Sequence, residues 1–102
     1  MNSLFESRFR EMKHNRFTDK QVRAGFFAIW RVQKPVIYWK ILWEVISTIM
    51  VYVPSTNNYT YSIVMSINEK WDKLSDEDQI NIIAALSRMN KKGKIDRIFD
   101  QL

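Results

Sequence analysis

The sequence predicts an all-α fold, a compact bundle of five or six helices that forms one domain over residues 1–102. Apolar residues recur at spacings of three, four and seven along most of the chain, which is the period of an amphipathic helix. Capping sequences precede several of these segments, as expected at helix starts. Only two glycines and two prolines occur, so little of the chain favours irregular structure.

The first two helices are expected over residues 3–13 and 18–33. Each begins with a capping box, in which the side chains of the first and fourth residues bond to each other's backbone amides. The two capping boxes are Ser3 with Glu6 and Thr18 with Gln21. The residues predicted to line the buried face of the second helix are Val22, Phe26, Ile29, Trp30 and Gln33.

A central helix is expected over residues 35–53. It starts at Pro35, which is well tolerated in a first helical turn, and Pro54 ends it. The segment is apolar around nearly its whole circumference, which is typical of a helix buried in a core or a membrane. It is shorter than the roughly 20 residues that a bilayer requires and contains Lys40 and Glu44. We therefore expect no integral membrane span, and place this helix at the centre of the bundle.

The region after Pro54 allows two interpretations. Residues 54–58 read as a loop of five turn-forming residues. Alternation of larger and smaller side chains over 59–67 would suit a strand, giving an α+β fold with a hairpin at 49–67. We favour a helix over 60–74, because its apolar stripe continues through Trp71 and Leu74.

Two more helices are expected towards the C-terminus. Ser75 caps the first, three acidic residues at 76–78 occupy its first turn, and Gly93 ends it. The second contains apolar residues at the helical spacing. Among the predicted helices, the first and last are the ones most expected to fray or to dock elsewhere. The apolar residues of the last helix are Ile95, Ile98, Phe99 and Leu102.

The residue types argue against an enzyme. The chain has no cysteine and one histidine, His14, which lies in a polar stretch and is expected to be solvated or to cap a helix. A metal site built from Glu69, Asp72 and Asp76 would need a helix that runs through the predicted cap at Ser75. No cofactor and no metal are expected. Without cysteines and without a secretory signal, the chain is expected in the reducing cytoplasm.

The net charge is concentrated in the first third of the chain. Residues 1–34 hold eight Lys and Arg against three acids, a balance of +5, whereas residues 35–102 hold eight of each. Cations that neutralise phosphates bind nucleic acid, and the nearby Phe9, Phe17, Phe27 and Trp30 include candidates for stacking on bases. The predicted nucleic-acid-binding residues are Arg8, Arg10, Lys13, Arg16, Lys20, Arg23, Arg31 and Lys34.

The sequence therefore predicts a small non-catalytic accessory or regulatory factor that acts on nucleic acid, through its phosphate backbone or as a single strand, or on a nucleic-acid-handling machine. The alternative is a protein-interaction module, an inhibitor or assembly factor that meets an acidic partner surface; a homo-oligomer is also consistent with the many aromatic residues. Two further interpretations remain for the basic residues. They could belong to the solvated sides of two amphipathic helices and bind nothing, or they could contact an anionic membrane surface. A helix-turn-helix over 79–102 is disfavoured, because Asp96 and Asp100 beside Lys94 and Arg97 would repel phosphate.

Overall fold

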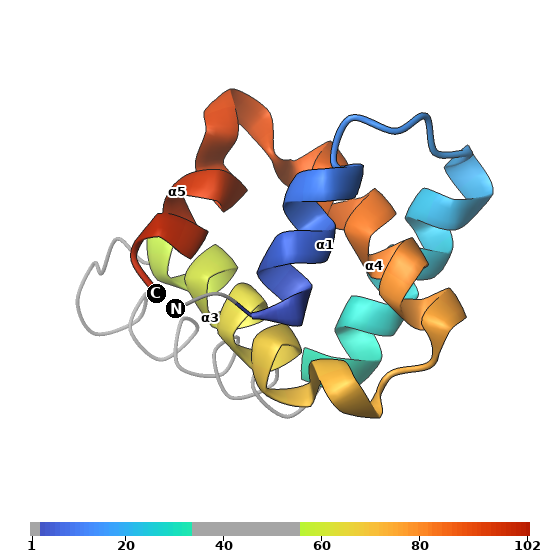
Figure 1. Ribbon diagram of the computed structural model, residues 1–102, viewed down its shortest axis with the longest axis horizontal. Coiled ribbons are helices and arrows are strands. Elements are labelled where there is room, and N and C mark those ends of the chain that lie inside the picture. Colours follow the sequence, from blue (N-terminus) through green and yellow to red (C-terminus); the bar gives the residue numbers. More distant parts are fainter. Residues whose placement is uncertain (1–2, 34–55) are drawn as a thin grey trace, which may run out of the picture.

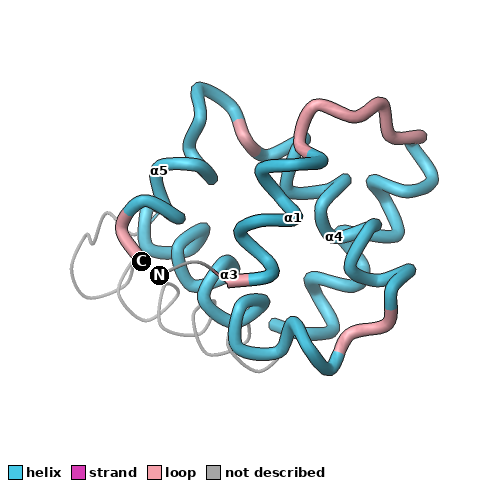
Figure 2. The backbone as a smooth tube through the Cα atoms, viewed as in Figure 1, coloured by secondary structure: helices cyan, strands magenta, loops and turns pink. Residues whose placement is uncertain are grey.

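The computed structural model describes residues 3–33 and 56–102. These residues form five α-helices and no strand (Figure 2), so the predicted all-α fold is confirmed. The predicted central helix at 35–53 lies outside the described residues, as do Lys34 and the first part of the predicted loop. The elements are α1 (Leu4–Met12), a helix over 19–33, α3 (Thr56–Lys70), the 3-10 turn η1 (Trp71–Lys73), α4 (Asp76–Met89), the 3-10 turn η2 (Lys91–Gly93) and α5 (Lys94–Asp100).

The helix starts follow the predicted caps. The Ser3 side chain accepts a hydrogen bond from the Glu6 amide at 3.0 Å. The second capping box is complete, since Gln21 N donates to Thr18 Oγ1 at 3.1 Å and Thr18 N donates to Gln21 Oε1 at 2.9 Å. The Ser75 side chain caps α4 by accepting from the Asp78 amide at 3.1 Å. Local sequence therefore sets where these three helices begin.

The alternative hairpin at 49–67 is wrong where the structure describes it, because α3 is helical throughout Thr56–Lys70. The predicted loop is also wrong over residues 56–58, which belong to the first turn of α3. Thr and Asn favour helix starts as well as turns, since their short polar side chains bond to nearby backbone groups. Burial of Ile63, Val64 and Ile67 explains why the helical spacing prevails over the alternation.

The fourth helix ends earlier than predicted. It stops at Met89, and Asn90 then accepts hydrogen bonds on its side-chain oxygen from the amides of Ile95 and Asp96, at 2.9 and 3.4 Å. Asn90 thus ends α4, and its side chain accepts from two amides in the first turn of α5. Gly93 adopts a left-handed conformation, with φ of 69°, in the turn between the two helices.

The first and last helices dock onto the same core (Figure 1), contrary to the expectation that they would fray or dock elsewhere. The ring of Phe5 lies 4.6 Å from that of Trp71 and 5.0 Å from that of Phe99, and Phe9 lies 5.5 Å from Phe99. These aromatic contacts join α1, η1 and α5. Large apolar side chains at both chain ends therefore hold the ends in place.

The helix over 19–33 presents a different face to the core than predicted. Val22, Ile29 and Gln33 are buried as expected, but Phe26 and Trp30 are exposed and Gly25 and Ala28 are buried instead. At Gly25 the helix approaches α4 so closely that a Cβ atom would lie 1.8 Å from the carbonyl oxygen of Asn81. This contact turns the larger side chains outward, towards solvent.

Candidate nucleic-acid interface

The predicted basic residues divide into two groups in the structure. Lys34 lies outside the described residues. Three cations form ion pairs with acids elsewhere in the chain: Arg10, Lys13 and Arg31. Four have no ion pair within residues 3–33 and 56–102: Arg8, which is half-buried, and Arg16, Lys20 and Arg23, which are exposed.

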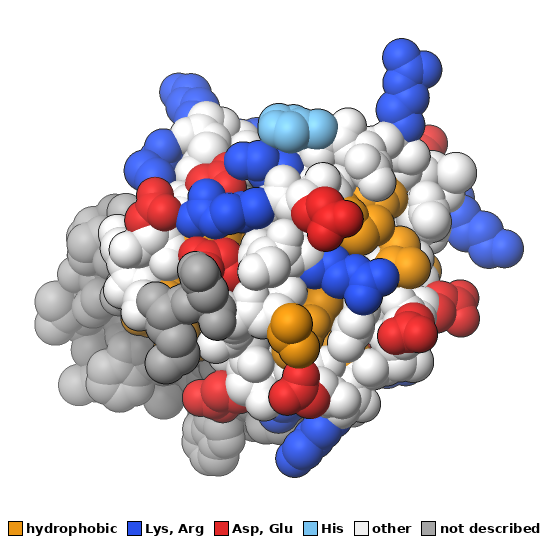
Figure 3. Space-filling view, viewed as in Figure 1, with side chains coloured by type: hydrophobic (Ala, Val, Ile, Leu, Met, Phe, Trp, Pro, Cys, Tyr) orange, Lys and Arg blue, Asp and Glu red, His pale blue; other side chains and the backbone are white. Residues whose placement is uncertain are grey.

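Arg10 and Lys13 connect α1 to α5. Arg10 contacts Asp100 at 2.8 Å, Asp96 at 3.3 Å and Glu6 at 3.3 Å, and Lys13 contacts Asp96 at 3.0 Å. The face seen in Figure 3 shows acidic and basic side chains side by side over these two helices. Because several charges share one network, these contacts hold the helices together better than isolated surface pairs would. Arg10 and Lys13 therefore have much of their charge compensated within the protein.

The network shifts the pKa of both an acid and a base, Asp96 and Arg10. Burial by itself would raise the pKa of Asp96, but hydrogen bonds from Asn90 and Lys13 and the charges of Lys13 and Arg10 outweigh it and hold that pKa below its ordinary value. For Arg10, burial opposes the charge, but hydrogen bonds to Asp100 and Glu6 prevail and the pKa is raised. Both groups therefore stay charged at neutral pH.

Replacing Asp96 with asparagine is expected to lower the free energy of unfolding by about 1–2 kcal/mol at pH 7, since hydrogen bonds between charged groups matter but partial exposure weakens them. A carboxyl whose pKa falls on folding stabilises the fold above its unfolded pKa, and this stabilisation is lost as the pH falls through the folded value. The difference between the two proteins in urea unfolding should therefore shrink below about pH 4.

The matched control for this prediction is Asp72→Asn, at an exposed aspartate that has no ion pair with the described residues. It should change stability by less than about 0.5 kcal/mol. A loss from Asp96→Asn that stays constant between pH 7 and pH 3 would contradict the role assigned to the charge.

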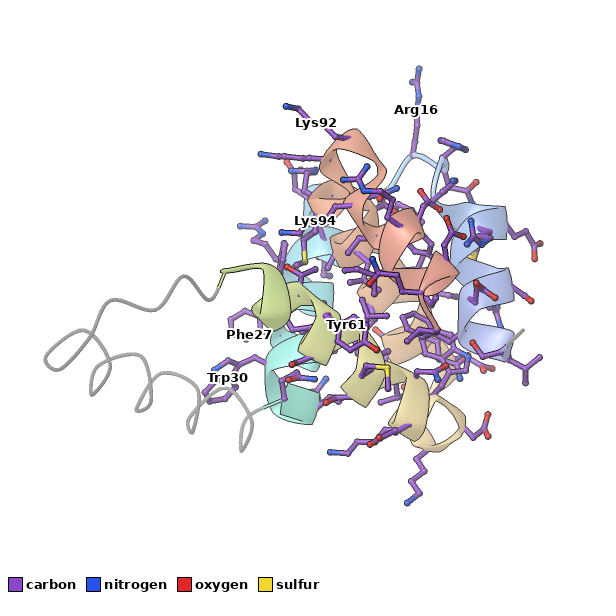
Figure 4. All side chains as sticks on the ribbon, turned by 90° about the vertical axis from the view of Figure 1, so that its left-hand side faces the viewer. Arg16, Phe27, Trp30, Tyr61, Lys92 and Lys94 are labelled. Carbon is purple, nitrogen blue, oxygen red and sulfur yellow. The ribbon has the colours of Figure 1, made fainter. Side chains whose placement is uncertain are left out.

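The solvent side of the helix over 19–33 combines cations and aromatic rings. Lys20, Arg23, Phe27 and Trp30 follow one another at spacings of three, four and three, so they share one helix face. Phe27 is 70% exposed and Trp30 48% exposed. Figure 4 shows both aromatic side chains on the same side of this helix. We call these four residues the aromatic-basic face.

The other two aromatic residues named from the sequence are not available for stacking. Phe9 is fully buried and Phe17 packs partly buried against the core. Arg31 follows the aromatic-basic face and bonds to Asp78 at 3.2 Å, in an exposed pair. Exposed pairs of this kind are weak, so Arg31 remains able to exchange its partner for a phosphate.

Sequence reasoning gave little weight to a second group of cations, those of η2 and α5. Lys91, Lys92, Lys94 and Arg97 line an open pocket together with Tyr61 of α3. Asp96 and Asp100 do not line it, since they face Arg10 and Lys13 of α1 instead. Their presence therefore does not exclude an anion from this pocket, as the sequence had suggested. The sequence did contain a signal for this group: Lys94 and Arg97 are three residues apart, a spacing that places both on one face of a helix.

The structure also places the one histidine and the acidic residues considered as metal ligands. His14 is exposed. Within residues 3–33 and 56–102, no three His, Asp or Glu side chains come together in a way that could hold a metal ion. In the same part of the chain, no helix is both long enough and apolar enough to cross a bilayer.

Comparison with protein-family models, with curated proteins and with solved structures finds no match for this chain.

Proposed function

We propose that this protein is a non-catalytic factor that binds single-stranded nucleic acid through its aromatic-basic face. The observation that supports this most is the exposure of Phe27 and Trp30 on the same helix face as Lys20 and Arg23. Large aromatic side chains are normally buried, because burying one stabilises the fold by about 1.5–3 kcal/mol. Lys20 and Arg23 have no ion pair with the described residues, so the exposure of these rings beside them favours a ligand that supplies both flat rings and negative charge.

Single-stranded nucleic acid has both properties. Its phosphates would contact Lys20 and Arg23, with release of counterions, and its unstacked bases would lie on Phe27 and Trp30. A duplex offers phosphates, but its bases are stacked inside the helix and cannot reach these rings. The face would therefore prefer a single strand, with little discrimination between sequences, because every base has a flat ring surface.

The test is a fluorescence-anisotropy titration of the full chain with a short labelled single strand and the matching duplex, at low and near-physiological salt. We expect the strand to bind more tightly than the duplex, with an affinity that falls steeply as salt rises. The charge reversal Lys20→Glu/Arg23→Glu should weaken strand binding at least about tenfold, the equivalent of ~1.4 kcal/mol. Phe27→Ala should weaken it by about 5-fold to 150-fold, since stacking on one base contributes ~1–3 kcal/mol.

Each variant has a matched control. Lys70→Glu/Lys73→Glu makes the same change in net charge at two exposed lysines that are not part of the face; of these, Lys70 donates to the Val32 carbonyl at 3.2 Å. Leu4→Ala removes an apolar side chain that is 73% exposed on α1. Both should bind the strand within about twofold of the unmodified protein. Equal losses from the charge reversal and from its control would show that only net charge matters, and the assignment to this face would be wrong.

A protein partner is the second candidate, and the exposed apolar side chains favour it. Phe26 is 41% exposed and extends the exposed apolar surface of Phe27 and Trp30, and exposed aromatic clusters mark binding surfaces. Absence of strand binding even at low salt would favour this candidate. The Phe27→Ala/Trp30→Ala variant should then fail to bind an identified partner, whereas Lys20→Glu/Arg23→Glu should still bind it. Buried aromatic contacts contribute more to affinity than charges at the rim of an interface.

A further inference from the structure

An open pocket of about 500 Å³ lies where α3, η2 and α5 meet. Four of its described lining residues are cations, and none of them is an acid. Figure 4 shows Tyr61 on α3 and Lys92 and Lys94 at the turn that leads into α5. The volume lies within the ~300–1,000 Å³ range of sites for small molecules. The described lining residues are Tyr61, Lys91, Lys92, Lys94, Arg97, Ile98 and Gln101.

The short helix α5 separates its charges onto two faces. Lys94, Arg97 and Gln101 fall at spacings of three and four and line the pocket. Asp96 and Asp100, four residues apart, bond to Arg10 across the interface with α1. The acids nearest in sequence are thus occupied elsewhere, so nothing among the described residues neutralises the cations of the pocket. Like charges gathered without counter-charges repel one another, and an anion would relieve that repulsion.

The turn before α5 holds its cations in defined positions. Lys92 adopts a left-handed conformation, with φ of 56°, which is uncommon for any residue other than glycine. The Arg97 guanidinium donates to the Lys92 carbonyl, and the Asn90 amide donates to Asp96 at 2.9 Å. Arginine has five N–H donors, so this bond leaves most of them for a ligand. The turn therefore presents an arginine with a fixed orientation beside three lysines.

We propose that this pocket binds a chain of linked phosphate groups, as carried by a nucleoside triphosphate or by inorganic tripolyphosphate. Several phosphates in a row match several cations around one small cavity, whereas a single phosphate would leave most of them uncompensated. Arginine and lysine are the usual phosphate-binding side chains, arginine through paired hydrogen bonds and lysine as a point charge. Tyr61, which is 37% exposed in the pocket wall, offers a ring to the base of a nucleotide.

Isothermal titration calorimetry of the full chain with ATP, tripolyphosphate and adenosine tests this proposal. We expect both phosphate chains to bind and adenosine alone not to bind. Lys91→Glu/Lys94→Glu should weaken both at least about tenfold, since hydrogen bonds to charged groups contribute ~1.5–3 kcal/mol. Neither lysine side chain takes part in an ion pair with the described residues, so this variant should fold. Lys70→Glu/Lys73→Glu, with the same change in net charge, should change both affinities less than about twofold.

Replacing Tyr61 with serine separates the two sources of phosphate. Weaker binding of ATP with unchanged binding of tripolyphosphate would assign the pocket to a nucleotide, through the ring. Unchanged binding of both would assign it to inorganic polyphosphate. Failure of both to bind the unmodified protein, or equal losses from the pocket variant and its control, would overturn the proposal.

Protection of lysines from chemical acetylation tests the same proposal on the unmodified protein. ATP or tripolyphosphate should slow the acetylation of Lys91 and Lys94 by a small reagent, read by mass spectrometry, and leave Lys70 and Lys73 unaffected. Equal protection of all four lysines would contradict a specific pocket. The pocket does not depend on the aromatic-basic face, so Lys20→Glu/Arg23→Glu should retain its affinity for ATP, whatever the outcome of the strand titrations.

Discussion

Replacing Gly25 with alanine is expected to lower the free energy of unfolding by about 2–3 kcal/mol, although alanine is the better helix former by ~1 kcal/mol. The added Cβ would lie 1.8 Å from the Asn81 carbonyl oxygen, 2.6 Å from its carbon and 2.9 Å from the Ala85 side chain. The first two of these atoms belong to the backbone of α4, so the two helices would have to separate. Separation would open gaps in the core that Ile29 and its neighbours now fill.

Urea unfolding followed by circular dichroism measures this loss, and the melting temperature should fall by about 10 °C or more for a chain of this size. Gly93→Ala is the control, because its Cβ would meet only the Arg97 side chain, at 3.9 Å. Its cost arises from the left-handed backbone alone, about 1–2 kcal/mol. An alanine at residue 25 that leaves stability unchanged would mean that the helix does not approach α4 as closely as the structure shows.

Replacing Phe5 with alanine should destabilise the protein by about 3–5 kcal/mol, the range measured for a fully buried phenylalanine. Phe5 has no exposed surface and contacts the rings of Trp71 and Phe99. Its loss would leave a cavity between α1, η1 and α5, and the surrounding rings would collapse only partly. Since α5 also lines the pocket beside η2, the pocket should be disturbed wherever α5 loosens.

Phe27→Ala is the matched control for Phe5→Ala, because it removes the same side chain from a position that is 70% exposed. Its effect on the free energy of unfolding should stay within about 0.5 kcal/mol. The two variants therefore separate stability from binding: Phe5→Ala should lower the free energy of unfolding strongly, and Phe27→Ala should leave the fold intact while it weakens strand binding. Similar losses of stability in both would contradict the docking of α1 onto the core.

The same packing that makes Gly25 critical also forms the aromatic-basic face. With Gly25 and Ala28 against the core, the positions on the opposite side of the helix carry Phe27, Trp30 and Arg23 into solvent. Had Phe26 and Trp30 been buried, as the apolar pattern suggested, less aromatic surface would remain beside the cations. The candidate site is thus a consequence of how one helix is rotated in the bundle.

The sequence by itself determined the fold class and the starts of three helices, because these depend on interactions between residues close in the chain. Caps such as Ser3, Thr18 and Ser75 act within one helical turn. The apolar period likewise identified the buried side of the last helix, with Ile95, Ile98 and Phe99. Those predictions were correct, and the excess of cations in the first third of the chain was visible from composition alone.

The tertiary structure decided which faces are buried and which charges are compensated, because both depend on residues distant in sequence. From the sequence alone, Gly25 would only weaken its helix; its role in the close approach to α4 appears only in the folded structure. The rotation of the helix over 19–33 was therefore not predictable. Arg10 and Asp96, 86 residues apart in the chain, bond to each other. That pairing compensates positive charge in the predicted basic region. It also directs the acids of α5 towards α1, so they do not line the pocket. Charge balance is a long-range property, so only the folded chain shows which cations remain available to a ligand.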